Sequence, residues 1–233
     1  MPSFDIIKEV NPNMTFRVSS IVGAFDLDVE HINEHFQGNI DIENKDWNVG
    51  LIVGGSGTGK STIAKEIFPQ HYIKHFEYNQ KSVIDDMPKN KSIKDIEMTF
   101  TSVGFASPPS WLKPYDVLSN GEKMRVDLAR SLLEDREIIV FDEFTSVVNR
   151  EVAKTSSYAI SKAVKKNKKK FVAVACHKDI IDWLEPDWIY DTDEKSFFIQ
   201  RESTTAPNSN LKYIGLTKNI KSKYGKFLES III

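Results

Sequence analysis

Gly54-Gly55-Ser56-Gly57-Thr58-Gly59-Lys60-Ser61-Thr62 is the stretch that decides the fold of this chain. It follows the apolar run Val49–Val53 and precedes Ile63–Ile67, a segment typical of a helix. A strand, a glycine-rich loop and a helix in this order form the phosphate-binding P-loop. Glycines let successive N–H groups point at phosphate oxygens, and the helix N-terminus adds the positive end of its dipole. The pattern predicts a nucleoside triphosphate site, and the alternative is a glycine-rich turn without a ligand.

Two side chains of this loop have predicted roles of their own. Lys60 is spaced to reach the β- and γ-phosphates, and the hydroxyl of Ser61 is spaced to hold Mg²⁺. The backbone of residues 54–62 is expected to surround the phosphates.

Bulk composition limits the class of protein. The chain has 233 residues, 40% of them hydrophobic, and a net charge of −2. This suits one large domain with a packed core and argues against general nucleic-acid binding through charge. The single Cys176 excludes an internal disulfide framework and suits a reducing compartment. No apolar run approaches the roughly 18 residues of a membrane span, and the N-terminus does not resemble a signal peptide. We therefore expect a cytoplasmic location.

Outside the loop, predicted strands alternate with predicted helices. Residues 35–53 are expected to supply the strand before the loop, and 24–42 fit either a strand or a short helix. Further strands are expected at 14–22, 82–85, 138–141 and 171–175, helices at 92–101, 120–133 and 150–165, a proline-broken connector at 107–114, and a closing hairpin from 188–190 and 197–199. Alternation of this kind implies an α/β fold with a mainly parallel sheet covered on both faces.

Two carboxylates follow a short apolar run typical of a buried strand. Asp142 and Glu143 come directly after Ile138–Phe141. In an open α/β sheet, ligands bind at the carboxyl ends of the strands. There, Asp142 can hold Mg²⁺ and Glu143 can orient or deprotonate an attacking water. The alternative is a strand that ends in exposed acids.

Leu118-Ser119-Asn120-Gly121-Glu122 has two interpretations. Ser119 and Glu122 match the S-x-x-E capping box of the helix that follows, and spacing alone favours this cap. Together with the P-loop and the acidic strand, however, the stretch resembles the L-S-G-G-Q signature loop of ABC-type ATPases. Asn120 and Glu122 replace the first glycine and the glutamine of that pattern, while Ser119 and Gly121 match it. Both interpretations can hold at once.

Other positions take their expected roles from this resemblance. Thr145–Asn149 corresponds to the D-loop, with Asn149 in place of the usual aspartate. His177 follows an apolar strand, as the switch histidine of the family does, and is expected to contact the γ-phosphate. The family's Q-loop glutamine has no match, because Asp85 and Asp86 occupy its place. Asp86 is accordingly a predicted metal ligand. For the aromatic residue that stacks on adenine, Phe25 is the first choice and Phe16 the second.

The resemblance covers roughly residues 14–202 and is nearest to soluble ABC ATPases of phages and bacteria. Some members of that group carry a C-terminal acetyltransferase-like domain, and too few residues follow 202 to hold one. We expect an ATPase domain over 1–202, with a helical signature subdomain over about 86–135. Residues 203–233 are expected to form a linker and a basic amphipathic helix.

Two weaker patterns favour ordinary structure. His31-Ile32-Asn33-Glu34-His35 matches the inverted zinc-peptidase motif, but no third ligand is evident, and a chance match is the default interpretation. The lysine-rich run 165–170 can attract nucleic acid or an acidic partner, but a solvated helix C-terminus is the simpler interpretation.

The resemblance implies Mg²⁺-dependent ATP hydrolysis in a head-to-tail homodimer. ATP on the P-loop of one copy would lie against Ser119, Asn120 and Gly121 of the other. Three uses of this cycle compete. The preferred one is a soluble switch or clamp that acts on nucleic acid or a protein partner. The others are the motor subunit of a transporter, and an assembly module that binds nucleotide without useful turnover.

Overall fold

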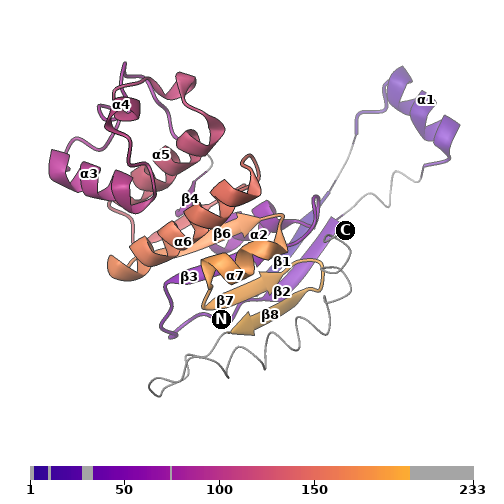
Figure 1. Cartoon of the computed structure of the whole chain (residues 1–233). Coiled ribbons are helices and arrows are strands. Elements are labelled where there is room, and N and C mark those ends of the chain that lie inside the picture. Colours follow the sequence, from indigo (N-terminus) through magenta and orange to yellow (C-terminus); the bar gives the residue numbers. More distant parts are fainter. Residues whose placement is uncertain (1–2, 10–11, 28–33, 74, 200–233) are drawn as a thin grey trace, which may run out of the picture. The chain divides into compact units, whose positions relative to one another are not determined.

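The computed structural model describes residues 3–9, 12–27, 34–73 and 75–199. Its centre is a six-stranded sheet in the order β4-β5-β6-β3-β7-β8 (Figure 1). The strands are β3 (Val49–Val53), β4 (Tyr72–Ile73), β5 (Ile138–Phe141), β6 (Lys170–Ala175), β7 (Trp188–Asp191) and β8 (Ser196–Ile199). All neighbours are parallel except β7 and β8, which form an antiparallel hairpin at the edge. The predicted parallel sheet and closing hairpin are confirmed.

The central strand β3 is buried on both faces, so its side chains divide between two cores. Val49, Leu51 and Val53 belong to one hydrophobic cluster, whereas Ile52 belongs to the other. Because successive side chains of a strand point to opposite faces, an all-apolar run is what a strand covered on both sides requires.

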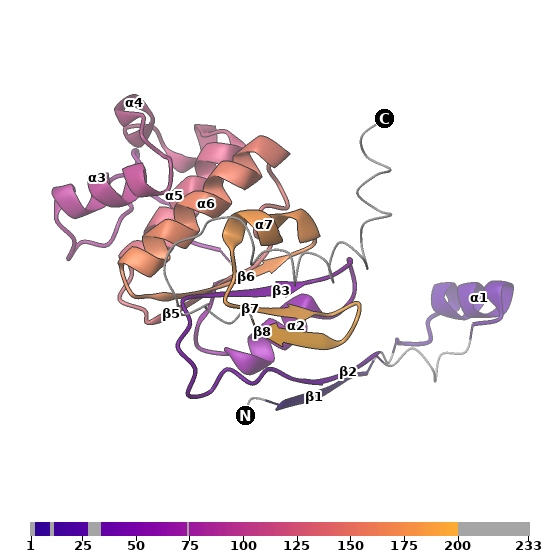
Figure 2. The same cartoon turned by 60° about the horizontal axis from the view of Figure 1, so that its bottom comes forward.

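Helices cover both faces of the sheet, as Figure 2 shows. One face carries α5 (Asn120–Leu133), α6 (Arg150–Lys166) and α7 (Ile181–Leu184). The other face carries α2 (Lys60–Ile67), together with the antiparallel pair β1 (Ser3–Lys8) and β2 (Glu34–Asn39).

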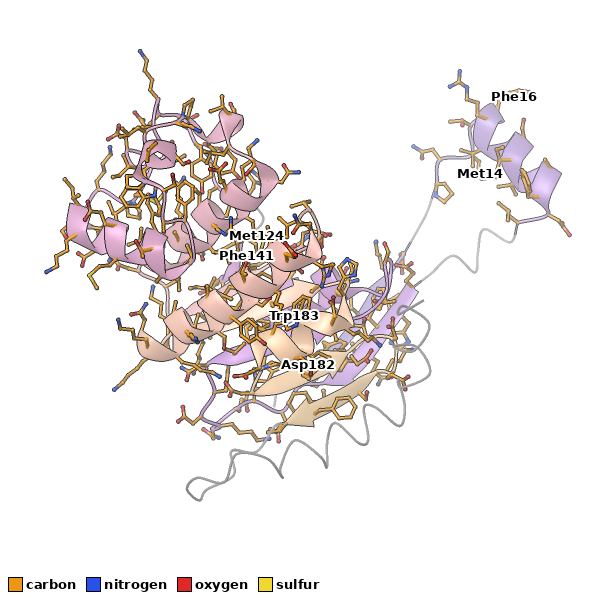
Figure 3. The ribbon with its side chains drawn as sticks, in the orientation of Figure 1. Met14, Phe16, Met124, Phe141, Asp182 and Trp183 are labelled. Carbon is orange, nitrogen blue, oxygen red and sulfur yellow. The ribbon has the colours of Figure 1, made fainter. Side chains whose placement is uncertain are left out.

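The segment between β4 and β5 is helical. It contains α3 (Ile93–Ser102), α4 (Pro108–Trp111), the 3₁₀ turn η2 (Tyr115–Val117) and α5. Capping boxes begin α3 at Ser92 and α5 at Ser119. Met124 of α5 lies in the same hydrophobic cluster as Phe141 of β5, which ties this segment to the sheet (Figure 3). The predicted helices at 92–101 and 120–133 are confirmed.

The predicted strand at 14–22 is wrong. The structure has α1 (Phe16–Phe25) there, and Thr15 is its N-cap, with a side chain that accepts a hydrogen bond from the amide of Val18. The hydroxyl of Ser20 also donates to the carbonyl of Phe16, one turn earlier. The loose alternation of the sequence concealed an N-cap signal, and a cap favours the helix at this position.

Two further local predictions, the strand at 82–85 and the connector at 107–114, also differ from the structure. Residues 82–85 form a turn instead of a strand, because the Ser82 hydroxyl bonds the Asp85 carboxylate and the Asp85 amide donates to the Ser82 carbonyl. Within the predicted connector, residues 108–111 form the short helix α4. Proline suits the first turn of a helix, where its missing N–H costs no hydrogen bond.

Several predictions concern other parts of the chain. The lysine-rich run begins in the last turn of α6, but Lys169 donates to the carbonyls of Leu132 and Glu134, so this lysine is a structural contact. No helix within the described ranges is long and apolar enough to cross a membrane. The predicted linker and tail helix at 203–233 lie outside the described residues.

Candidate functional site

The P-loop connects β3 to α2 through glycines in a left-handed conformation. The φ angles of Gly57 and Gly59 are +81° and +83°. A Cβ atom on Gly59 would also collide with the ring of Phe36 from β2. Other residues are strained at such angles, so the loop needs glycine at these two positions.

Helix α2 begins in a way that suits an anion. Gly59 is its N-cap, and among the residues that the structure describes no side-chain cap bonds the start of the helix. Lys60, in the first turn, is only 8% exposed, and its ammonium donates to the carbonyl of Gly55 in the loop. Open helix amides and a buried cation that faces the loop are the donors that phosphate requires. The residues present therefore fit the triphosphate of ATP.

Ser61 and Asp142, the predicted magnesium ligands, meet at a residue that the motifs did not identify. Tyr72 of β4 lies opposite Val140 of β5 in the parallel register. Its hydroxyl donates to Oδ2 of Asp142, and the side chain of Ser61 lies close to the same phenol. A carboxylate and a hydroxyl are hard oxygen ligands, the kind that Mg²⁺ takes in proteins. The donor set thus fits Mg²⁺.

Tyr72 keeps its proton in this environment. Burial raises the pKa of Tyr72 well above its ordinary value, and the hydrogen bond to the Asp142 carboxylate raises it further. The phenol is therefore a hydrogen-bond donor at every physiological pH.

The loop after β5 holds Glu143 in an unusual backbone conformation. Glu143 and Thr145 have φ angles of +53° and +68°, and neither is glycine. The Glu143 amide donates to Oδ1 of Asp142 at 2.9 Å, and the Phe144 amide donates to the carbonyl of Val174 on β6 at 2.9 Å. Backbone strain of this kind persists where the surroundings impose it, and it concentrates at functional sites. The loop leaves the side chain of Glu143 exposed beside Asp142.

His177 follows β6, the strand between β3 and β5, and its side chain is exposed. The three strand ends that carry the P-loop, Glu143 and His177 therefore lie at one edge of the sheet. The neighbouring Lys178 forms ion pairs with Asp191 at 2.8 Å and with Asp193 at 3.0 Å.

The turn between β7 and β8 supports the P-loop through hydrogen bonds. The sequence analysis did not predict this role of the turn. Asp193 Oδ1 accepts from the Gly55 amide at 2.8 Å, and the hydroxyls of Thr192 and Thr58 are hydrogen-bonded. Burial raises the pKa of Asp193, but the Gly55 amide and Lys178 outweigh it, so the net pKa is lowered. These partners are more than 130 residues apart in sequence, and no local motif marks them.

The predicted signature residues lie at the start of α5. Ser119 is the N-cap, its amide donates to Oε2 of Glu122 at 3.0 Å, and Ser110 donates to Oε1 of Glu122 at 2.8 Å. The capping interpretation is thus confirmed. Within the part of the chain that the structure describes, no hydrogen bond joins residues 119–121 to the P-loop, so their contact with nucleotide stays a prediction. Asn149 caps α6 by accepting from the Val152 amide at 2.9 Å.

The predicted roles of three other residues are not tested by their positions in the structure. The carboxylate of Asp86 accepts from the amides of Asn79 and Gln80, at 3.0 Å and 3.2 Å to Oδ1. Phe16 and Phe25 lie on α1, 88% and 69% exposed, and Figure 3 shows Phe16 on that helix. Metal binding by Asp86 and adenine stacking by Phe25 or Phe16 remain predictions.

Of the zinc-peptidase pattern, only Glu34 and His35 lie in the described residues. Both are on strand β2, and the His35 ring is hydrogen-bonded to the carboxylate of Asp5 on β1. A zinc-peptidase motif would need a helix to bring its histidines to one face, and Glu34 and His35 lie on a strand instead, which agrees with the default interpretation of a chance match.

Comparison with known proteins identifies the family. Residues 50–221 match the family described as "ATPase family associated with various cellular activities (AAA)". The energy-coupling factor transporter ATP-binding protein EcfA1 of Mycoplasmopsis synoviae is 27% identical over 176 residues, which cover 60% of this chain and 66% of that protein. An uncharacterized ABC transporter ATP-binding protein of Haemophilus influenzae is 30% identical over 137 residues, which cover 45% of this chain and 54% of that protein. The chain thus spans less than two thirds of either relative.

Solved structures support the fold. The ATP-binding cassette MJ0796, in a dimeric post-hydrolysis state bound to ADP and Pi, is similar with a TM-score of 0.57 and 15% identity over 72% of this chain and 93% of that one. cbiO1 from Clostridium perfringens, part of an ABC transporter complex, is similar with a TM-score of 0.56 and 18% identity over 85% of this chain and 89% of that one. From the match of residues 50–221 and the geometry of the P-loop, we conclude that the chain belongs to the AAA family of ATPases. From the similar solved structures, we conclude that it has the fold of an ATP-binding cassette.

Proposed function

We propose that this chain is the ATP-hydrolysing subunit of an ABC transporter. The observation that carries the hydrolytic part is the convergence of Ser61 and Asp142 on Tyr72, with Glu143 next to Asp142. The transporter part rests on the relatives, which are described as transporter ATP-binding proteins.

In this proposal each site residue has one task. The P-loop amides and Lys60 bind the phosphates, while Ser61 and Asp142 hold Mg²⁺. The metal, when bound, neutralises charge on the phosphate oxygens. Glu143 orients a water molecule and accepts its proton, and His177 donates a hydrogen bond to the γ-phosphate.

The proposed assembly is a two-fold, head-to-tail dimer. Ser119, Asn120 and Gly121 of a second copy would complete the site opposite the P-loop. Such an isologous contact makes two equivalent nucleotide sites. Hydrolysis would remove the γ-phosphate contacts and let the dimer open. The dimeric state of the similar cassette MJ0796 supports this arrangement.

Steady-state ATPase measurements test the function. We expect Glu143→Gln to lower the rate by roughly 10²-fold or more while nucleotide affinity is kept, because a general base contributes about that much. Lys60→Ala should lose nucleotide affinity. Glu151→Gln, in the exposed first turn of α6, is the matched control and should keep the wild-type rate. Equal rates for wild type and Glu143→Gln would remove Glu143 from the mechanism.

The same assay separates the three uses. A switch or clamp on nucleic acid or a protein partner, which the sequence analysis preferred, predicts stimulation by DNA, RNA or a soluble protein partner. A transporter subunit predicts stimulation only by a co-purified multi-span membrane protein, and an assembly module predicts binding without turnover. The transporter is proposed here because the named relatives support it. The cytoplasmic location and the likeness to a phage and bacterial group stay predictions.

A further inference from the structure

Tyr72 lies between the two proposed magnesium ligands, and neither the motifs nor the relatives assign it a role. It belongs to the short edge strand β4, which pairs only with β5 among the described strands. Its ring is partly buried against the cluster that contains Ile63 and Ala64 of α2. The ammonium of Lys65 lies 4.9 Å from the ring centroid. These contacts fix the ring, so the direction of the hydroxyl is fixed as well.

The hydroxyl has a defined set of partners. A phenol has one proton to donate, and here that proton goes to Oδ2 of Asp142. The side chain of Ser61 lies close to the same phenol. The geometry of the hydroxyl is thus one donated bond to a proposed metal ligand, with the second proposed ligand beside it.

The hydrogen bond that Tyr72 donates leaves the Asp142 carboxylate able to bind a cation as well. Asp142 receives one donor on each oxygen, from Tyr72 on Oδ2 and from the Glu143 amide on Oδ1, and a carboxylate has about four acceptor sites in all. Lone pairs on the Asp142 carboxylate thus remain for a hard cation.

We propose that Tyr72 is a positioning residue for the magnesium site: its hydroxyl orients the Asp142 carboxylate, which lies with Ser61 at the end of the P-loop, for a bound cation. The proposal rests on the proposed ATPase function and extends it to a residue outside the P-loop and the acidic pair after β5. Partners that orient metal ligands are worth about 10–100-fold in metal affinity.

The test is a fluorescence titration of a labelled ADP, first in EDTA and then across a series of Mg²⁺ concentrations. In Tyr72→Phe, we expect the Mg²⁺ concentration at half-effect to rise about 10-fold. The affinity in EDTA should stay within about 2-fold of wild type, because the P-loop is untouched. A merely structural role would weaken binding in EDTA as well. Tyr158→Phe, an exposed tyrosine on α6, is the matched control and should behave as wild type.

A second measurement reads the metal directly. With Mn²⁺ in place of Mg²⁺, electron paramagnetic resonance counts the metal bound with ADP, and Tyr72→Phe should need about 10-fold more Mn²⁺. An unchanged Mg²⁺ dependence in Tyr72→Phe, or equal weakening with and without metal, would overturn the role of Tyr72 alone. Absence of ADP binding by the wild-type protein would overturn the proposed function instead.

Discussion

Several residues that match sequence motifs also stabilise the local structure as helix caps. Ser119 and Glu122 occupy the signature stretch and also form the capping box of α5. Asn149 caps α6, at a position that the sequence resemblance aligns with the D-loop. Asparagine is as good an N-cap as aspartate, so the helix accepts this departure from the family pattern without loss.

Glu122 gives a prediction about pH. The Ser119 amide lowers the pKa of Glu122 below its ordinary value of 4.5, and the hydroxyls of Ser110 and Ser119 lower it further. A lowered folded-state pKa stabilises the protein above the unfolded value and ceases to do so as pH falls through the folded value. Glu122→Gln should therefore cost about 1 kcal/mol of unfolding free energy at pH 7. Urea titrations should show this difference shrink below pH 4.5. A difference that is constant with pH would contradict the assignment.

Residues with local signals could be predicted, and residues defined by distant contacts could not. The P-loop, the acids after β5 and the cap at Ser119 are each written in a few adjacent positions. Tyr72 and Asp193 have no such pattern, because their partners come from other elements: Tyr72 meets Asp142, and Asp193 meets Gly55. Only the sheet order brings these pairs together.

At the scale of elements, buried strands and capped helices were the predictable parts. The bounds of β5 and α5 match the sequence prediction because each has a continuous apolar pattern and a clear start. The strand predictions for residues 14–22 and 82–85 were wrong because Thr15 and Ser82 form local hydrogen bonds. Weak apolar alternation in the sequence does not reveal such bonds. Capping and turn chemistry determines such short segments.

Helix α5 holds the segment after β4 through a polar cluster. Asp127 accepts from the hydroxyls of Tyr78 at 2.7 Å and Tyr115 at 2.8 Å. The two rings are stacked, with centroids 3.9 Å apart, and Arg130 lies 4.8 Å from the centroid of Tyr78. Burial raises the pKa of Asp127, although the two tyrosines and Arg130 partly oppose it.

This cluster predicts a pH dependence opposite in sign to that of Glu122. A carboxyl whose pKa is raised on folding binds more protons in the folded state, so stability falls as pH rises above the unfolded value of 3.8. Relative to Asp127→Asn, the wild type should lose unfolding free energy as pH rises from 3.8 toward neutrality. Urea titrations of both proteins measure this, with Asp116→Asn, on the exposed surface of η2, as the control. A wild type that gains stability over this range relative to Asp127→Asn would contradict the burial argument.

At the scale of the whole molecule, the sheet order places the parts of the site. Strands β5, β6 and β3 are adjacent and parallel, so Glu143, His177 and the P-loop leave the sheet at the same edge. The signature residues Ser119–Gly121 begin a helix outside this sheet. One copy thus supplies the phosphate side of the site, and the proposal assigns the opposite side to a second copy.

The most direct test is sedimentation velocity of Glu143→Gln with and without ATP and Mg²⁺, because slow hydrolysis preserves any nucleotide-bound assembly. We expect a monomer without nucleotide and a dimer with ATP, and we expect that Ser119→Arg added to Glu143→Gln abolishes the dimer. Glu143→Gln that binds ATP but stays monomeric at high protein and ATP concentrations would contradict the completion of the site by a second copy.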